Sequence, residues 1–248
     1  MGLIKGVLKL VLSILFVCSL VSFIVLSSLS DSFQEDIFKE KFKEAVKQNN
    51  QFASEIDRGY QKVNEHFFIL NKTENFVIEG QAFNLTITKQ DANLSNQDFS
   101  ELVLEKIADS AYNAEQETPL GVLSIKSFAD KTNYYSKMFM ILGVIFGLCL
   151  FVLFSGRFAL LGINFLVVSV FYYPTKFMFL TIGRKIGSNL PDIFANFMNN
   201  LMLNSYNISS RFFFWFLVTG IVLIMVGILI KFLKIGLWFQ GFFESKKK

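Results

Sequence analysis

The sequence predicts an all-α polytopic membrane protein, with a four-helix transmembrane bundle and a small α+β extracytoplasmic domain between spans 1 and 2. Three observations support this fold class. The 248-residue chain is 52% hydrophobic, has a mean hydropathy of +0.45 and contains 31 phenylalanines. Its apolar residues are concentrated in long blocks that are almost free of charge. The charged residues lie between these blocks, and the longest polar region follows the first block.

The first predicted span is the uncharged block Leu10–Leu29. At about 1.5 Å per residue, a helix of this length matches a hydrocarbon core of about 30 Å. Two lysines precede the block and serines stand at its end, a pattern that also fits a cleavable signal peptide. The apolar part of a signal peptide is usually about 7–15 residues. We therefore predict that residues 1–30 form an uncleaved signal anchor.

Residues 31–137 are predicted to form the extracytoplasmic domain. This region holds 18 acidic and 12 basic residues, whereas the whole chain has a net charge of +4. The basic balance therefore comes from lysines near membrane ends and does not indicate nucleic-acid binding. Both cysteines, Cys18 and Cys149, lie in apolar blocks, which excludes a disulfide-stapled domain and a cysteine-rich zinc site. The single histidine, His66, matches no metal-ligand spacing.

A helix is predicted over residues 31–70, because apolar and small residues recur at spacings of four and three. They are Phe38, Phe42, Ala45, Asn49, Phe52, Ile56, Gly59 and Val63. Ser32 is a candidate N-cap with Glu35 completing a capping box, or the helix continues out of span 1. The Asn-Asn and Arg-Gly pairs are candidate breaks. The apolar stripe packs either on its own domain or against another chain.

A β-hairpin and a second helix are predicted next. Phe83, Leu85 and Ile87 alternate with polar residues, as in a strand, and residues 75–78 are a plausible partner strand. The following helix is amphipathic and has Ser95 or Asn96 as its cap. Its apolar residues are Phe99, Leu102, Val103, Ile107 and Ala111. A third helical stretch after Pro119 is expected to lead into the membrane.

The block from Met138 to Pro174 contains a single charged residue, Arg157. One helix of this length would measure about 55 Å and would place the arginine near the bilayer centre, at a cost of about 2.5–3.5 kcal/mol. Residues 138–173 are therefore predicted to be a transmembrane hairpin. Spans 2 and 3 are separated by a turn at Ser155–Arg157, with the arginine among the headgroups.

Residues 212–248 are predicted to be span 4 followed by a basic cytoplasmic tail. With both termini in the cytoplasm of a cell-membrane protein, most lysines that flank the spans lie on the inner side. Four sequons then lie on the outer side and are candidate glycosylation sites. They are Asn71, Asn84, Asn93 and Asn207.

Residues 174–211 are rich in apolar residues but also contain four basic residues. We predict that they form an outer interfacial loop and helix, with an apolar face that begins after Pro191. The alternative is a re-entrant segment that lines a pore, with Asn196, Asn199, Asn200 and Asn204 at its mouth.

No predicted span contains Asp, Glu, Lys, Arg or His, which argues against proton-coupled transport and against an intramembrane protease. The sequence shows no phosphate loop, dinucleotide fingerprint or nucleophile elbow. No catalytic, metal-binding or cofactor-binding residue is therefore assigned, and no cofactor is expected. The Gly143–Gly147 pair and the Gly220–Gly227 pair are candidate helix contacts, either within the bundle or with a second chain.

The sequence favours a non-enzymatic interaction or structural component that acts through its extracytoplasmic domain. The expected partners are membrane lipids and either a protein or further copies of the chain, without nucleic acid. A pore or facilitator for neutral solutes is the first alternative. A surface enzyme that acts on lipid or glycan is the second, because carboxylates are plentiful in the polar region.

Overall fold

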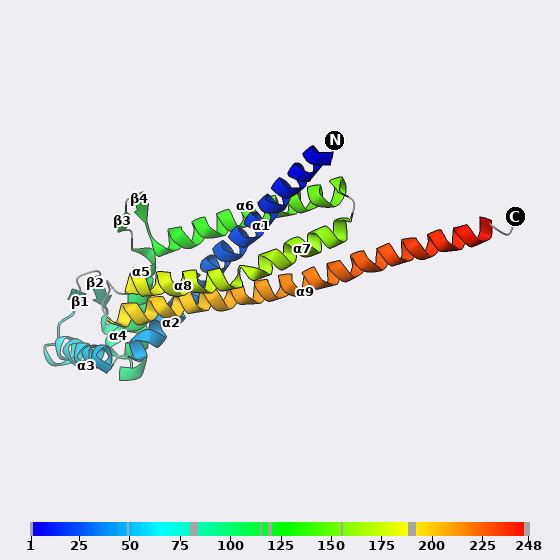
Figure 1. Cartoon of the computed structure of the whole chain (residues 1–248). Helices are drawn as coiled ribbons and strands as arrows, with labels where there is room; N and C mark the ends of the chain where they lie inside the picture. Colours follow the sequence, from blue (N-terminus) through cyan, green and yellow to red (C-terminus); the bar gives the residue numbers. More distant parts are fainter. Residues whose placement is uncertain are drawn as a thin grey trace. The chain divides into compact units, whose positions relative to one another are not determined.

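The computed structural model describes residues 2–48, 50–79, 84–114, 116–118, 121–154, 156–187 and 192–245, and this part is almost entirely helical (Figure 1). Four helical segments are long and apolar enough to cross a membrane. They are Ile4–Ser32, Ile125–Leu153, Arg157–Lys185 and Ala195–Leu233. The prediction of a mainly helical chain with four potential spans is therefore confirmed.

The chain divides into two compact units. The membrane unit comprises residues 1–28, 132–179 and 205–248, and the polar unit comprises residues 29–131 and 180–204. Residues 180–204, which are predicted to belong to the interfacial loop and helix, are thus part of the polar unit.

The helices that contribute to the membrane unit pack around one apolar cluster. They are α1 (Gly2–Ser32), α6 (Ile125–Leu153), α7 (Arg157–Val170), α8 (Tyr172–Gly187) and α9 (Asp192–Ser245). The buried cluster contains Phe16, Val17, Leu20, Ile24, Leu150, Val168 and Phe213. One polar contact crosses this apolar packing, since the buried Asn164 side chain donates a hydrogen bond to the Ser13 hydroxyl at 3.2 Å. Such bonds hold membrane helices together at modest energies, about 0.6 kcal/mol on average.

The break between α6 and α7 coincides with the turn that the sequence predicts. Gly156 takes a left-handed conformation with φ of 76°, which a residue with a side chain rarely adopts. Arg157 begins α7, and its guanidinium carbon lies 4.8 Å from the centre of the Phe151 ring. The arginine is thereby kept at the helix start and out of the middle of a span.

The helices do not end at the limits predicted for span 3 and for the loop after it, and those membrane limits stay predictions. The chain breaks at Phe171, and α8 then passes through Pro174. Pro174 lacks the N–H that would continue α7 but is tolerated in the first turn of α8. The predicted boundary at residues 211 and 212 is not a helix end, because α9 continues unbroken through it. An interfacial position for residues 174–211 stays a prediction.

The polar unit contains most of the shorter elements. They are α2 (Glu35–Lys47), α3 (Asn50–Asn64), the π-helix η1 (Glu65–Ile69), β1 (Phe76–Glu79), β2 (Asn84–Ile87), α4 (Lys89–Ala92), α5 (Asn96–Asn113), β3 (Gln116–Thr118) and β4 (Gly121–Leu123). The predicted cap at Ser32 is wrong, because Ser32 ends α1 and its hydroxyl accepts a hydrogen bond from the Asn204 amide at 3.2 Å. The Asn-Asn pair coincides with the break between α2 and α3, whereas Arg58 and Gly59 lie inside α3.

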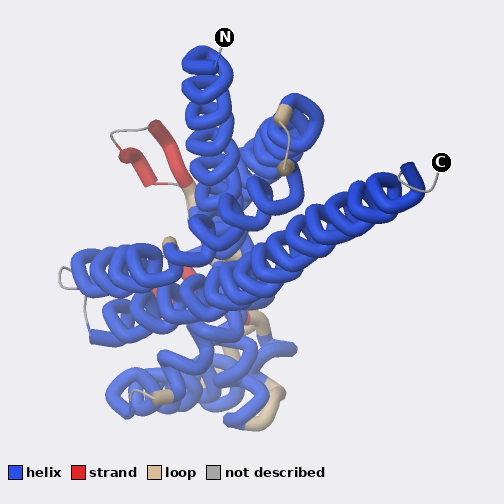
Figure 2. Tube along the Cα trace, turned by 45° about the vertical axis from the view of Figure 1, so that its right-hand side comes forward, coloured by secondary structure: helices blue, strands red, loops and turns tan. Residues whose placement is uncertain are grey.

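Both hairpins are antiparallel and appear as short red strands in Figure 2. β1 and β2 form the predicted hairpin, and Leu85 and Ile87 are buried as the alternation requires. The predicted strand residue Phe83 lies outside the described residues. β3 and β4 were not predicted, and α6 begins only at Ile125. Ser95 caps α5 by accepting a hydrogen bond from the Asp98 N–H, as expected.

The apolar stripe of α2 packs within the polar unit. Phe38 and Phe42 are nearly inaccessible, and both rings meet Phe197 edge to face at 4.9 and 5.5 Å. Tyr112 of α5 lies against the Phe38 ring, with centres 5.4 Å apart. The stripe is therefore covered by the chain's own residues, as the first of the two sequence interpretations expects.

Three ion pairs join α2 to α5, and from one pair to the next the residue number rises on α2 and falls on α5. They are Lys39–Asp109, Lys43–Glu105 and Lys47–Glu101. The successive spacing of four residues on each helix places the three pairs in a row. The pairs lie at the surface, so they contribute little energy individually and mainly favour this alignment of the two helices.

Asp91 gives the polar unit an acid-sensitive contact. Burial raises the pKa of its carboxyl group, but hydrogen bonds from the Thr88 N–H at 3.0 Å and from Lys106 Nζ at 2.9 Å outweigh burial and lower the pKa below the ordinary 3.8. A lowered pKa means that ionised Asp91 stabilises the fold above its unfolded-state pKa, and that this contribution is lost as the pH falls through the folded-state pKa.

We expect the amides of α4 to lose hydrogen-exchange protection below about pH 4, after correction for the intrinsic exchange rate. Asp91→Asn should remove this acid dependence, whereas Glu40→Gln on α2 should leave it intact. Equal acid sensitivity in wild type and Asp91→Asn would contradict the assignment.

Candidate functional site

The four glycines singled out from the sequence all face neighbouring helices of the membrane unit. A Cβ atom at Gly143 would lie 3.0 Å from Leu20, and one at Gly147 would lie 2.9 Å from Phe16, both on α1. A Cβ at Gly220 would meet the backbone of Gly162, and one at Gly227 would meet that of Ala159, both on α7. These glycines therefore serve close packing within one chain.

Sequence reasoning missed Gly162, which has the tightest surroundings of these helix-contact glycines. A Cβ there would lie 2.7 Å from the Gly220 carbonyl oxygen and 2.7 Å from Ile224 Cγ1. Gly162 is an isolated glycine in an apolar span, so no short spacing marked it. Its partner Gly220 is on a distant part of the chain, and only the fold brings the two together.

The sequon asparagines lie in different environments. Asn71 has φ of 49° and follows η1, and it is exposed. Asn93 is exposed at the end of α4, and Asn207 is exposed within α9. The side chain of Asn84 lies outside the described residues. Glycosylation at these positions stays a prediction.

The asparagines assigned to a pore mouth have contacts inside the polar unit. Asn204 binds Ser32 as described above, and Asn199 Oδ1 lies 2.9 Å from where a Cβ of Gly183 would be. Asn196 is exposed and Asn200 is partly buried. The pore hypothesis is not tested by these contacts and remains an alternative.

A groove of about 710 Å³ opens on the polar unit, between the α3–η1 segment and the turn from α4 to α5. It is lined by Tyr60, Gln61, Asn64, Glu65, Phe68, Ile69, Ala92, Asn93, Leu94 and Asn96. The Tyr60 hydroxyl donates a hydrogen bond to the Leu94 carbonyl oxygen at 3.0 Å and so ties the two sides together. Four of the lining side chains are amides, which both donate and accept hydrogen bonds.

Large apolar side chains are exposed beside this groove. Phe68, Ile69 and Leu70 are 50%, 76% and 56% exposed. We call these three residues the apolar tip. Phe68 and Ile69 also line the groove, so the tip and the groove form one continuous surface.

Phe68 and Ile69 of the tip belong to the π-helix η1, in which the Leu70 N–H donates to the Glu65 carbonyl oxygen at 2.8 Å. Phe67 of the same helix is buried, whereas Phe68 and Ile69 are exposed. His66 fixes this segment on β1, because Nε2 lies 3.0 Å from the Glu74 carbonyl oxygen and the ring contacts Phe76. The lone histidine therefore has a structural position.

The sequence contained a signal for the tip that we did not use. Four consecutive apolar residues, Phe67 to Leu70, come after the end of the predicted helical stripe at Val63, and they are followed by Asn71 and Lys72. Such a run at a helix end is either core or exposed for binding. Only the structure shows that residues 68–70 are exposed.

The groove has few features of a metal or catalytic centre. Glu65 is the only carboxylate among its described lining residues. Across the described part of the chain, no three His, Cys, Asp or Glu side chains gather where they could hold a metal ion. Comparisons with protein-family models, curated proteins and solved structures found no match.

Proposed function

We propose that this protein is a non-enzymatic multi-pass membrane protein that binds a partner protein through the groove and apolar tip of its polar unit. The observation that carries the proposal is the continuity of the two features. Three consecutive exposed apolar side chains, two of which line the groove, adjoin a set of groove amides on a unit whose own core is already well buried.

The apolar tip favours binding because exposed apolar clusters are costly in water. Single exposed apolar residues are common, but contiguous ones beside a groove typically mark interaction sites. Burying one such side chain contributes about 1.5–3 kcal/mol. Phe68 and Ile69, which belong to both features, are therefore expected to contribute most of the binding energy.

The groove favours an extended polypeptide segment as the occupant. Gln61, Asn64 and Asn96 offer donors and acceptors that match the peptide groups of an extended chain. Asn96 is held by its own hydrogen bond to Asp57 at 3.1 Å, so its amide is preoriented. Because the lining is nearly uncharged, we expect the affinity to depend only weakly on salt concentration.

We also propose that the polar unit faces the outside of the cell membrane, with both termini in the cytoplasm and an uncleaved signal anchor. Lysines concentrated near the inner ends of the predicted spans support this orientation. Asn93 lines the groove and belongs to a sequon, so a glycan at Asn93 and a partner in the groove would exclude one another.

A surface enzyme and a neutral-solute pore remain the alternatives, and no particular observation favours either. An enzyme acting in the groove would be expected to depend on Glu65, the carboxylate among its described lining residues. Glu65→Gln should therefore abolish an enzymatic activity of the groove if one exists. Under our proposal, the same substitution should leave partner binding nearly unchanged.

The proposal is tested with the full chain, crosslinked in its own membranes and then purified, with copurifying proteins quantified by mass spectrometry. We expect the double substitution Phe68→Ser, Ile69→Ser to reduce the main partner by at least about tenfold, since two apolar anchors are lost. Glu40→Ser, on the exposed surface of α2, is the matched control and should retain the partner.

Two outcomes would overturn the proposal. A partner retained equally by wild type and by the double variant would place the interaction elsewhere. A wild-type protein that purifies alone after mild crosslinking would remove the interaction altogether. Hydrogen exchange at α2 and α5 verifies that the double variant is folded.

A further inference from the structure

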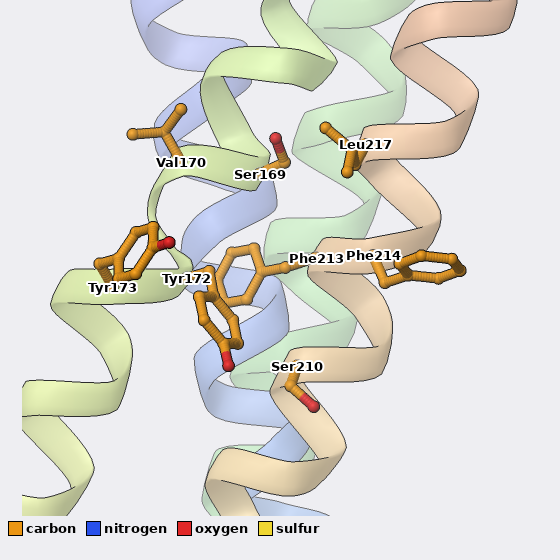
Figure 3. A pocket seen from close by; sticks show the side chains of 8 residues that line it. All are labelled: Ser169, Val170, Tyr172, Tyr173, Ser210, Phe213, Phe214 and Leu217. Carbon is orange, nitrogen blue, oxygen red and sulfur yellow. The ribbon is translucent and has the colours of Figure 1, made fainter.

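A second hollow lies in the membrane unit, where α7 ends and α8 begins. It has a volume of about 480 Å³ and is lined by Ser169, Val170, Tyr172, Tyr173, Ser210, Phe213, Phe214 and Leu217 (Figure 3). Its size is within the usual range of small-molecule pockets, about 300–1,000 Å³. It lies beside Phe171, the single residue between the end of α7 and the start of α8.

The side chains around this pocket differ between its two ends. Figure 3 shows Val170, Leu217 and Ser169 at one end, and the Tyr172 hydroxyl directed toward the end where Ser210 lies. The Ser169 hydroxyl donates a hydrogen bond to the Leu166 carbonyl oxygen at 2.7 Å, so it is satisfied within its own helix. At the polar end, the Tyr206 hydroxyl donates a hydrogen bond to the Tyr172 hydroxyl. The Lys176 ammonium lies 5.5 Å from the centre of the Tyr206 ring. Lys176 follows Tyr172 by one turn of α8, so its cation lies near the polar end although it does not line the pocket.

The helix lengths place this polar end at a membrane interface. A hydrocarbon core of about 30 Å corresponds to roughly 20 helical residues. Counting that distance from Arg157, at the start of α7, leads to Lys176. Counting it back from Lys231 along α9 leads to Arg211. Lys176 and Arg211 therefore reach the same interface, and the pocket lies just inside it.

The pocket opens to the lipid and not to a closed interior. Val170, Tyr173 and Phe214 are 65%, 75% and 59% exposed, so an acyl chain can enter from the side. Phe213, only 2% exposed, forms the floor. A chain lying on Phe213 and Leu217 would place its headgroup beside Tyr172, Ser210 and Lys176.

We propose that this pocket binds one membrane phospholipid with an anionic headgroup. The acyl chain occupies the apolar end, and the phosphate and its negative charge are held by Lys176 and the tyrosine and serine hydroxyls at the polar end. A cation next to hydroxyl donors is the chemistry that recognises a phosphate. The amphipathic lining selects a lipid over a free phosphate ion, because only a lipid fills both ends.

The test uses the full chain reconstituted in bilayers of phosphatidylcholine with a minor fraction of phosphatidylglycerol, released into mild detergent and measured by native mass spectrometry. We expect one phosphatidylglycerol to remain bound. Lys176→Gln should reduce this adduct at least fivefold, whereas Lys231→Gln, which removes a cation at the other interface, should not. Millimolar inorganic phosphate should not displace the lipid.

A second variant tests the apolar end independently of charge. Leu217→Trp is expected to fill the pocket and to reduce the phosphatidylglycerol adduct to a similar extent. Equal adducts in wild type, Lys176→Gln and Leu217→Trp would overturn the proposal, as would adducts that follow bilayer composition without a preference for phosphatidylglycerol. Displacement by inorganic phosphate would also overturn it, because the site would then recognise only the ion.

Discussion

Gly162→Leu is expected to be the most damaging single substitution in the membrane unit. Any side chain at this position meets the Gly220 carbonyl oxygen at 2.7 Å and the Ile224 backbone nitrogen at 3.0 Å. Backbone atoms of a long helix cannot move aside locally, so α7 and α9 must separate. Overpacking costs about 1–3 kcal/mol where side chains can adjust, and a larger loss is expected here.

The matched control is Gly6→Leu on α1, where a Cβ atom would have no neighbour within 4 Å. Both substitutions add the same apolar side chain to a potential membrane span. We expect the thermal midpoint of the full chain in mild detergent to fall strongly for Gly162→Leu and to change little for Gly6→Leu. Similar midpoints for the two variants would contradict the close contact between α7 and α9.

Phe38→Ala is expected to have the largest effect in the polar unit. Phe38 is 1% exposed, and its ring contacts Phe42, Tyr112 and Phe197. Removing a buried phenylalanine ring costs about 3–5 kcal/mol, because apolar burial is lost and a cavity remains. Since Phe38 joins three segments that are distant in the sequence, its loss should weaken all three together.

Hydrogen exchange of the full chain measures this effect locally. Amides of α2 and α5 should lose protection in Phe38→Ala by an amount that corresponds to about 3–5 kcal/mol. Phe68→Ala removes the same ring from a half-exposed position and should leave protection unchanged. If the two variants lose protection equally, Phe38 does not form the centre of this core.

The membrane part of the fold could be predicted because hydrophobic length is a local property. Four apolar blocks are visible in the sequence, and the single charge at Arg157 marks the turn between two of them. The β1–β2 hairpin could also be predicted, because the alternation at Leu85 and Ile87 is a short-range pattern in the sequence.

Features that depend on contacts between distant segments could not be predicted. Nothing near Gly162 in the sequence indicates that Gly220 will face it. An interfacial element was inferred at residues 174–211 from apolar residues mixed with four basic ones, but such a composition does not show that α9 runs continuously from Asp192 through residue 211. The β3–β4 hairpin has strands of three residues, too short for an alternation to be recognised.

The candidate site could not be predicted from the sequence for a similar reason. Phe67 and Phe68 are adjacent and chemically identical, yet one is 1% exposed and the other 50%. Phe67 lies four residues after the buried Val63 and continues its stripe, whereas Phe68 lies off the stripe. The groove amides come from α3, α4 and α5, so their proximity is a property of the folded unit.

Photo-crosslinking in native membranes tests most directly whether the groove and apolar tip bind a partner protein. A photoreactive phenylalanine analogue replaces Phe68 in one full-length variant and Glu40 in another. We expect a defined adduct with one partner protein at position 68, at a yield at least about tenfold above that at position 40. No adduct at position 68, or the same adducts at both positions, would contradict the proposed function.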